Sequence, residues 1–300
     1  MEKDSAHAAF DIGSNTARGI LGRPGGDGVV RVLAADQRVT ALGRGLGEGR
    51  AFDRHALNST IGFVAETLER WGRPPRAHAV ATAAGRSAGN PDELRTRLLA
   101  EAGVAVQIIE PQEEARLAWL GAFAVEPPIR AERPALVDIG GRSVEAMVER
   151  GGELAAISRP LGARSFAEAL PDSNLPWEMQ VALHFPMMAA TLRDAVDAVA
   201  DADVVVATGG TAQAAARLLG KRSIESSEIC DLLFDLGRLS FEERRERMWF
   251  DPDRAEIICP GLGILHVFAE GAPDSRIIVS DGGVREGLLL DRTGGARLRW

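Results

Sequence analysis

Short apolar runs alternate with segments of helical spacing along most of the chain. Between the first two runs, apolar residues recur at spacings of four, three and four, as on one face of a helix (Leu57, Ile61, Val64 and Leu68). The apolar runs are brief and end at polar or glycine-containing turns, so they predict strands over residues 8–12, 77–82, 104–109, 204–208 and 277–280. Strands that alternate with helices predict an α/β protein.

Four further helices are predicted from start signals and apolar spacing. Asn90 precedes Pro91, and an N-cap followed by proline at the first helical position is a typical helix start. Together the signals predict helices over residues 90–99, 111–123, 176–200 and 226–248.

One segment of the chain occurs twice. Asp11-Ile12-Gly13 is followed by a hydroxyl-bearing turn and a second apolar strand, and the same arrangement returns 127 residues later at Asp138-Ile139-Gly140. In each copy a pair of glycines (Gly25-Gly26 and Gly151-Gly152) then leads into a third strand, over 29–33 or 154–158. A unit of three strands used twice predicts two related lobes with a cleft between them.

The stretch 125–134 contains three prolines and cannot sustain a helix. We therefore expect a boundary there, with a first lobe over residues 1–124 and a second over 125–300.

Composition and charge narrow the functional classes. The chain has 300 residues, 45% of them hydrophobic, and 43 acidic against 35 basic residues give a net charge of −8. This balance does not attract DNA, RNA or an anionic membrane, so neither nucleic acid nor membrane is expected as a partner. The two cysteines, Cys230 and Cys259, form no disulfide framework, and no apolar run is long enough to span a membrane; we expect a cytoplasmic protein.

The repeated turns have the residue types that bind phosphate together with a divalent cation. Glycine lets backbone N–H groups approach an anion, serine or threonine adds a donor, and a carboxylate such as Asp11 or Asp138 can hold Mg²⁺. A single turn of this kind is more often an ordinary β-turn. Two matching copies, with a third glycine turn at residues 208–211, favour a phosphate-binding cleft.

With these motifs in view, the sequence resembles the exopolyphosphatase and guanosine pentaphosphate phosphohydrolase (Ppx/GppA) family, in a short form without the C-terminal helical domain of longer relatives. The resemblance implies a two-lobe actin-like fold, similar to acetate kinase and sugar kinases, with a duplicated ribonuclease H-like core and an interdomain cleft. The motifs that carry it occur in order at residues 11–16, 81–90, 113–117, 121, 137–145, 161–162, 208–212, 254–261 and 284–288.

The resemblance also implies roles for individual residues. Glu114 matches the general base that activates water, although an acid in the first turn of a helix is also common without any catalytic role. Asp11, Asp138 and Glu145 match the Mg²⁺ ligands, and Arg86 matches an arginine that reaches the substrate phosphates. The remaining phosphate-binding positions are Gly13, Ser14, Asn15, Thr16, Gly140, Gly141, Arg142, Ser143, Gly209, Gly210 and Thr211. Arg285 and Glu286 either join the site or pair with each other.

The second phosphate loop departs from the family pattern. Where the family has Gly-Gly-Gly-Ser-Thr, this chain has Gly140-Gly141-Arg142-Ser143-Val144. Arg142 either adds a phosphate ligand or fills the site, and it would be strained if the position requires a positive φ.

The expected function is Mg²⁺-dependent hydrolysis that releases terminal orthophosphate from inorganic polyphosphate or guanosine pentaphosphate, by a homodimer. The short form would offer less surface to a long polymer. Two alternatives stay open: a kinase or other phosphotransferase of the same fold, and a catalytically weak polyphosphate- or nucleotide-binding regulatory protein, because of Arg142 and Val144.

Overall fold

The computed structural model describes residues 5–25, 28–46, 49–124, 129, 131–151, 153–170 and 175–294. The chain divides into two units: unit 1 comprises Met1–Ile129 and Gly282–Trp300, and unit 2 comprises Arg130–Asp281. Half of the predicted boundary stretch 125–134, namely residues 125–128 and 130, lies outside the described residues, as do Gly26 and Gly152 of the two predicted glycine reversals.

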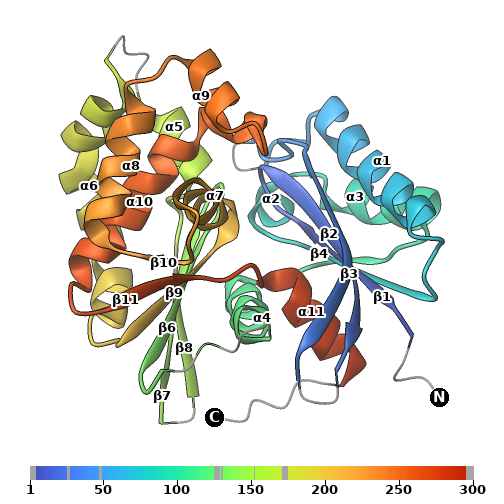
Figure 1. The fold of residues 1–300 in the computed structure, drawn as a ribbon. Helices are drawn as coiled ribbons and strands as arrows, with labels where there is room; N and C mark the ends of the chain where they lie inside the picture. The colour runs from blue at the N-terminus through green and yellow to red at the C-terminus, as the bar shows by residue number, and fades with distance from the viewer. Residues whose placement is uncertain are drawn as a thin grey trace. The chain divides into compact units, whose positions relative to one another are not determined.

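Unit 1 is built on a five-stranded sheet in the order β3-β2-β1-β4-β5 (Figure 1). The first three strands form an antiparallel meander, and the last two run parallel to β1. The strands are β1 (His7–Ile12), β2 (Thr16–Pro24), β3 (Val30–Val39), β4 (Arg76–Ala81) and β5 (Val106–Ile108).

Helix α1 illustrates how the pattern determines the unit 1 elements. Asp53 caps it by accepting a hydrogen bond from the backbone N–H of Ala56, and the apolar residues at the predicted spacing are all buried in the unit 1 core. The helices of unit 1 are α1 (Arg54–Arg70), α2 (Ala83–Ser87), α3 (Pro91–Arg97) continued by a π turn (Leu98–Ala102), α4 (Pro111–Phe123) and α11 (Val284–Thr293).

Unit 2 contains a six-stranded sheet in the order β10-β11-β9-β6-β7-β8. Its strands are β6 (Pro134–Ile139), β7 (Val144–Arg150), β8 (Glu153–Arg159), β9 (Val204–Thr208), β10 (Ser223–Ile224) and β11 (Arg276–Val279). Its helices are α5 (Ala163–Ala169), α6 (Trp177–Val199), α7 (Gly209–Leu219), α8 (Ser226–Gly237), α9 (Phe241–Arg247) and α10 (Ile258–Gly271), with a 3-10 turn at Pro252–Glu256. Within the described residues, no helix is long and apolar enough to cross a membrane.

The two sheets confirm the predicted repeat. In unit 1 the antiparallel strands β3-β2-β1 are followed by the parallel strands β4 and β5, and in unit 2 β8-β7-β6 are followed by β9 and β11 in the same sense. Asp11 and Asp138 therefore occupy equivalent positions, one residue before the end of β1 and of β6.

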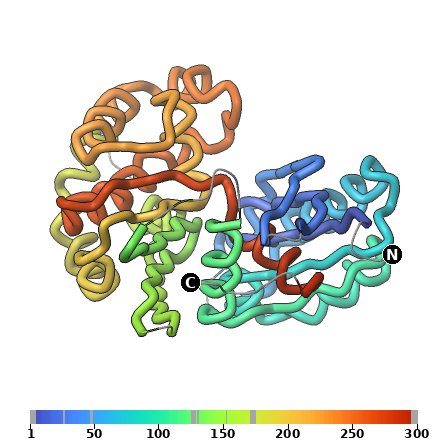
Figure 2. The backbone as a smooth tube through the Cα atoms, turned by 60° about the horizontal axis from the view of Figure 1, so that its bottom comes forward, coloured from blue at the N-terminus to red at the C-terminus, as the bar shows by residue number. Residues whose placement is uncertain are grey.

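The end of the chain returns to the first unit, although the predicted division places everything after residue 124 in the second lobe. Helix α11 lies beside α4 and also contacts β1 and β2 (Figures 1 and 2). Gly121 of α4 and Gly287 of α11 allow this packing, because a side chain on either would overlap the backbone of the other helix region.

The predicted helix over 226–248 is interrupted. Helix α8 ends at Gly237, and Ser240 starts α9 by accepting a hydrogen bond from the N–H of Glu243, whose carboxylate accepts one from the N–H of Ser240. This reciprocal cap begins a new helix within the apolar pattern.

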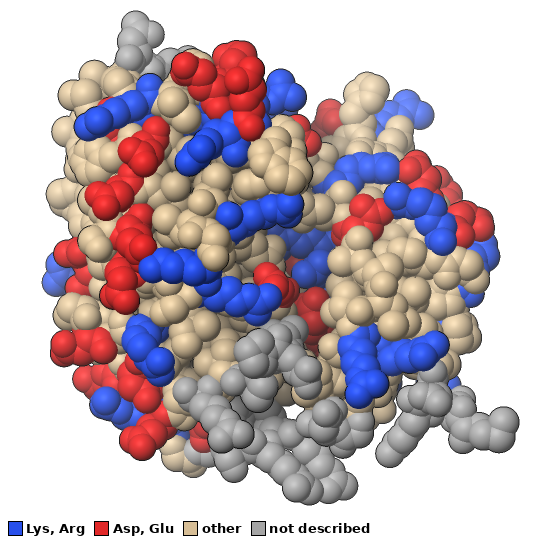
Figure 3. All heavy atoms as spheres, in the orientation of Figure 1, with Lys and Arg blue, Asp and Glu red and all other residues tan. Residues whose placement is uncertain are grey.

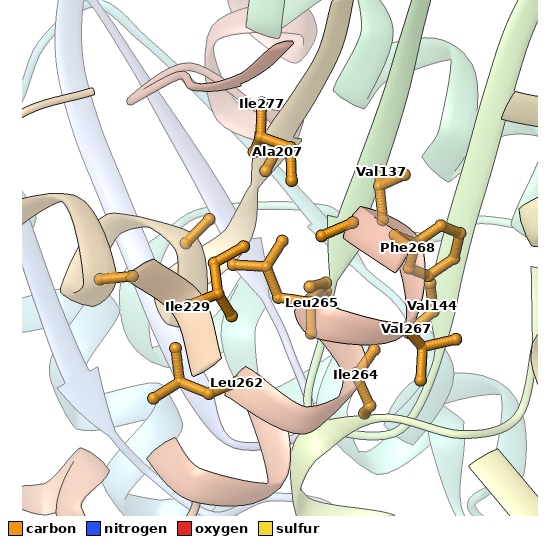
Figure 4. Close-up of a cluster of buried hydrophobic side chains, with 14 of the residues drawn as sticks. Val137, Val144, Ala207, Ile229, Leu262, Ile264, Leu265, Val267, Phe268 and Ile277 are labelled. Atoms are coloured by element: carbon orange, nitrogen blue, oxygen red, sulfur yellow. The ribbon is translucent and has the colours of Figure 1, made fainter. Parts of the chain in front are cut away.

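In β6, β7, β9 and β11, every second residue faces one hydrophobic core, shown in part in Figure 4. Val137 of β6, Val144 of β7 and Ala207 of β9 lie on this face and pack against α10, which is buried along nearly its whole length. Because side chains alternate along a strand, Asp138, Glu145 and Thr208 point to the opposite face. In the view of Figure 3, positive and negative side chains are interspersed.

Candidate active site

The first glycine turn connects β1 to β2 and is held by a neighbouring loop. The N–H of Gly13 donates to the carbonyl of Thr16 across 3.2 Å. The Asn15 carbonyl accepts hydrogen bonds from Thr40 (3.1 Å) and Ala41 (2.9 Å), and Ala41 has a positive φ of 49°. Ser14, Asn15 and Thr16 are buried, so this turn is a fixed part of unit 1 rather than an exposed loop.

Asp11 lies directly opposite Arg18 of β2. Opposite charges at a directly paired cross-strand position stabilise each other. The structure thus supplies a protein cation next to the first of the three predicted Mg²⁺ ligands.

Arg86 and Glu114 form an ion pair within unit 1. Arg86 Nη1 lies 2.9 Å from Glu114 Oε2 and also donates to the carbonyl of Ile109 across 2.6 Å. Glu114, in the first turns of α4, is 7% exposed. Both contacts use Nη1; in the part of the chain that the structure describes, the Nε and Nη2 groups of Arg86 make no hydrogen bond, so they can still bind an anion.

The second glycine turn connects β6 to β7 and is anchored by α5. The carbonyl of Gly140 accepts a hydrogen bond from Ala163, and the carbonyl of Gly141 accepts bonds from the next two residues of α5. Gly162 lies against this turn so closely that a Cβ there would come within 2.5 Å of the backbone N of Arg142. The motif at 161–162 therefore supports the second glycine turn.

The structure settles how Arg142 is accommodated. Among the described residues only Ala41 and Arg73 combine a side chain with a positive φ, so Arg142 is not strained. Its guanidinium lies 2.9 Å from Glu168 of α5, to which it is ion-paired. Val144, the second departure from the family pattern, is fully buried in the unit 2 core (Figure 4).

Asp138 and Glu145 are directly paired across the antiparallel strands β6 and β7. Glu145 is 1% exposed, and its Oε1 accepts a hydrogen bond of 2.8 Å from Ser158 of β8. Like charges at such a position repel. Together the two carboxylates and the Ser158 hydroxyl place three oxygen-bearing side chains in one row of the sheet, and oxygen is the ligand atom that a hard cation prefers.

This donor set fits Mg²⁺, which is held in proteins by one or two carboxylates while water and substrate phosphates complete its coordination. No group of three or more His, Cys, Asp or Glu side chains that could hold a metal ion is found among the residues described by the structure. A site built on Asp138 and Glu145 would therefore depend on water and substrate for its other ligands.

The third glycine turn begins helix α7. Gly209 has a φ of 88°, and a Cβ there would lie 2.5 Å from the carbonyl oxygen of Ile139 and 2.9 Å from Asp138 Oδ1, so only glycine fits. No side chain caps this helix start. The first N–H groups of α7 are thus available to an anion beside Asp138.

The side chain of Thr211 packs against Gly261 in the first turn of α10. Arg254 of the same motif is buried in an ion pair with Asp251 at 2.8 Å. Burial raises the pKa of the Cys259 thiol to about 12, so this cysteine stays protonated at neutral pH and is not a nucleophile. The motif at 254–261 therefore packs against the third glycine turn through Gly261 and Thr211.

The internal repeat relates residues of the two units. Arg86 lies on α2, the helix that follows β4, and Gly209 begins α7, the helix that follows the equivalent strand β9. Ser158 and Glu168 were not predicted as site residues. Their contacts, a hydrogen bond from Ser158 to Glu145 and an ion pair between Glu168 and Arg142, arise only from strand and helix packing. Arg285 and Glu286 pair with each other at 3.5 Å, and Glu286 also caps α11 through the N–H of Gly283.

The chain is similar to known proteins over most of its length. Exopolyphosphatase 1 of Mycobacterium leprae is 32% identical over 260 residues, which cover 80% of this chain and 74% of that protein. The solved structure of the Aquifex aeolicus Ppx/GppA enzyme matches 96% of this chain and 99% of its own, with a TM-score of 0.75 and 28% identity.

An exopolyphosphatase structure from Cytophaga hutchinsonii matches with a TM-score of 0.82 and 19% identity, over 97% of this chain and 99% of its own, and shows the shared fold. These matches confirm the predicted two-lobe α/β fold class. The model of the Ppx/GppA phosphatase family matches residues 25–294. The chain therefore belongs to the Ppx/GppA phosphatase family, whose members are hydrolases that act on phosphoanhydride bonds.

Proposed function

We propose that this protein is a Mg²⁺-dependent exopolyphosphatase that releases terminal orthophosphate from inorganic polyphosphate, with guanosine pentaphosphate as a second substrate. The observation that carries the proposal is the Asp138–Glu145 pair beside the glycine turn at Gly209, because it combines oxygen donors for a cation with N–H donors for a phosphate. The similarity to an exopolyphosphatase supports polyphosphate as the substrate.

Glu114 is the proposed general base. Its Oε2 is held by Arg86, and a carboxylate oriented in this way can take a proton from water. The water oxygen attacks the terminal phosphorus, the anhydride P–O bond breaks, and the shortened chain leaves with the bridging oxygen. In unit 1, Nε and Nη2 of Arg86 are donors for phosphoryl oxygens. In unit 2, the N–H groups at the start of α7 are such donors. Mg²⁺, when bound by Asp138 and Glu145, neutralises charge on the phosphate chain.

Asp11 is the least supported of the three proposed metal ligands, because Arg18 lies directly opposite it. We assign it to the support of the first glycine turn, together with Gly13, Ser14, Asn15 and Thr16.

The test is orthophosphate release from polyphosphates of several lengths, guanosine pentaphosphate and ATP, with and without Mg²⁺, beside a Glu114→Gln variant. Metal-dependent release that the variant loses supports the proposal, and the rates rank the substrates. Substrate binding without release would instead support the regulatory binding protein, and transfer of phosphate from ATP to an acceptor would support a kinase.

A cytoplasmic homodimer remains part of the proposal and rests on the family resemblance. Light scattering after size-exclusion chromatography measures the mass of the assembly, and a monomer mass at micromolar concentration would contradict it.

A further inference from the structure

Thr208 is a buried threonine whose hydroxyl makes no hydrogen bond to any described residue. It is the last residue of β9, is 1% exposed, and its Oγ1 has no hydrogen-bond partner among the described residues. Leaving a buried hydroxyl unsatisfied costs free energy that an apolar side chain of the same shape would not.

A threonine at the start of a helix usually has its hydroxyl in use as a helix cap. Thr208 is the N-cap residue of α7, where threonine commonly accepts a hydrogen bond from the helix N–H groups. Here the side chain makes no such bond, and the backbone is extended, with φ −121° and ψ 179°. Helix capping therefore does not account for this residue.

Thr208 belongs to a row of polar residues that crosses four adjacent strands. In the registers of the sheet, Ser158 pairs with Glu145, Glu145 with Asp138, and Asp138 with Thr208. Directly paired residues point to the same face, so the Thr208 hydroxyl shares its face with the two carboxylates. At the other end of the row, the Ser158 hydroxyl already donates to Glu145.

The same residue adjoins the N–H groups that begin α7. Gly209 follows it directly and lies close to Asp138 Oδ1. An anion bound by these N–H groups would therefore lie next to an unused hydroxyl donor.

We infer that the Thr208 hydroxyl is a further phosphate ligand, which donates a hydrogen bond to a phosphoryl oxygen held at the N-terminus of α7. The inference rests on the proposed function, because it assigns an additional contact to the same phosphate site. An anion site made of backbone N–H groups at Gly209 and Gly210 does not by itself require a hydroxyl at position 208.

The test compares Thr208→Val with Thr208→Ser in a Glu114→Gln background, which keeps the probe intact. The probe is tripolyphosphate with Mg²⁺, and its affinity is measured by isothermal titration calorimetry. We expect Thr208→Val to weaken binding by about tenfold, because a hydrogen bond to a charged group is lost, and Thr208→Ser to bind within about threefold of the reference. Without ligand, the melting temperature of Thr208→Val should equal or exceed that of the reference.

Thr60→Val is the matched control. Thr60 is fully buried in α1, and its hydroxyl donates to the carbonyl of Ala56 across 2.8 Å. This variant should bind tripolyphosphate normally and melt at a lower temperature.

Binding by Thr208→Val within twofold of the reference would overturn the inference. So would equal losses in the valine and serine variants, or a fall in melting temperature as large as that of Thr60→Val, since these would indicate a packing or structural role. If the reference protein itself binds no tripolyphosphate, the proposed function is contradicted. If the reference binds and Thr208→Val binds equally well, only the role of Thr208 is contradicted.

Discussion

The guanidinium of Arg86 holds Oε2 of Glu114 at 2.9 Å, although the two residues are 28 positions apart in the chain. The ion pair is largely withdrawn from solvent, with the Arg86 side chain 18% and the Glu114 side chain 9% exposed. One contact therefore fixes the orientation of the proposed base and compensates the charge of a buried carboxylate.

Removing the cation should destabilise unit 1 more than neutralising the acid. Arg86→Met removes the cation that is ion-paired with a buried carboxylate, and we expect the free energy of unfolding to fall by about 3 kcal/mol. Glu114→Gln should cost less, because the amide oxygen can still accept from Arg86. Denaturant unfolding of both single variants and the double variant measures the coupling, and strictly additive losses would show that the pair contributes no interaction energy.

Gly209→Ala should be damaging for two separate reasons. The positive φ strains any side chain, and the new Cβ meets the carbonyl of Ile139 and the carboxylate of Asp138. Gly220→Ala is a matched control, since Gly220 has a φ of 69° but open space around it. We expect the control to lose about 1 kcal/mol and Gly209→Ala to lose more, together with phosphate binding. If thermal unfolding shows the same loss of stability in both variants, the overlap of the new Cβ with Ile139 and Asp138 contributes nothing.

The two repeated aspartates should respond in opposite directions when they are neutralised. Asp138→Asn relieves the repulsion from Glu145, so without metal the protein should become more stable by about 0.5 kcal/mol, and the rise in melting temperature on adding Mg²⁺ should disappear. Asp11→Asn removes the charge opposite Arg18 and should lower stability while the Mg²⁺ response persists. A normal Mg²⁺ response in Asp138→Asn would exclude Asp138 as a ligand.

Stability should fall as the pH drops below about 6.5. Burial lowers the pKa of His78, and the positive groups His7, Arg292 and Arg76 lower it further; burial also lowers the pKa of His266. Because the unfolded chain then binds protons more readily, stability is complete above the unfolded value of about 6.5 and is lost as the pH falls through the lowered folded value. His78→Gln should reduce the difference between denaturant midpoints at pH 7.5 and 5.5, and an unchanged difference would exclude His78 as a cause.

Introducing the family residue at position 144 should not increase phosphate release. Val144→Thr buries a hydroxyl in the hydrophobic core, and we expect a loss of about 1–2 kcal/mol with no gain in phosphate release. Arg142→Gly is the separate test of the loop, since it removes the pair with Glu168 without touching the core. A large gain in release by Arg142→Gly would show that Arg142 obstructs the site, and a loss would show that it binds phosphate.

Much of the fold follows from local patterns. The four-three-four spacing in α1, the proline at the start of α3 and the repeated Asp-Ile-Gly turns each predict their elements, because periodicity and turn chemistry act over a few residues. Helices α2, α5, α10 and α11 were not predicted as helices. In α10 nearly every residue is buried, so no polar face marks the helical period.

The sequence by itself determined the α/β class, the duplicated turns, the family and the residue types of the proposed phosphate site, because these depend on spacing along the chain. Only the tertiary structure decided which residues form ion pairs: Arg86 with Glu114, and Arg142 with Glu168. It also decided that Ser158 donates a hydrogen bond to Glu145 and that α11 packs in the first unit. Each of these contacts joins residues separated in the chain, and it is strand register and helix packing that bring them within a few ångströms of each other.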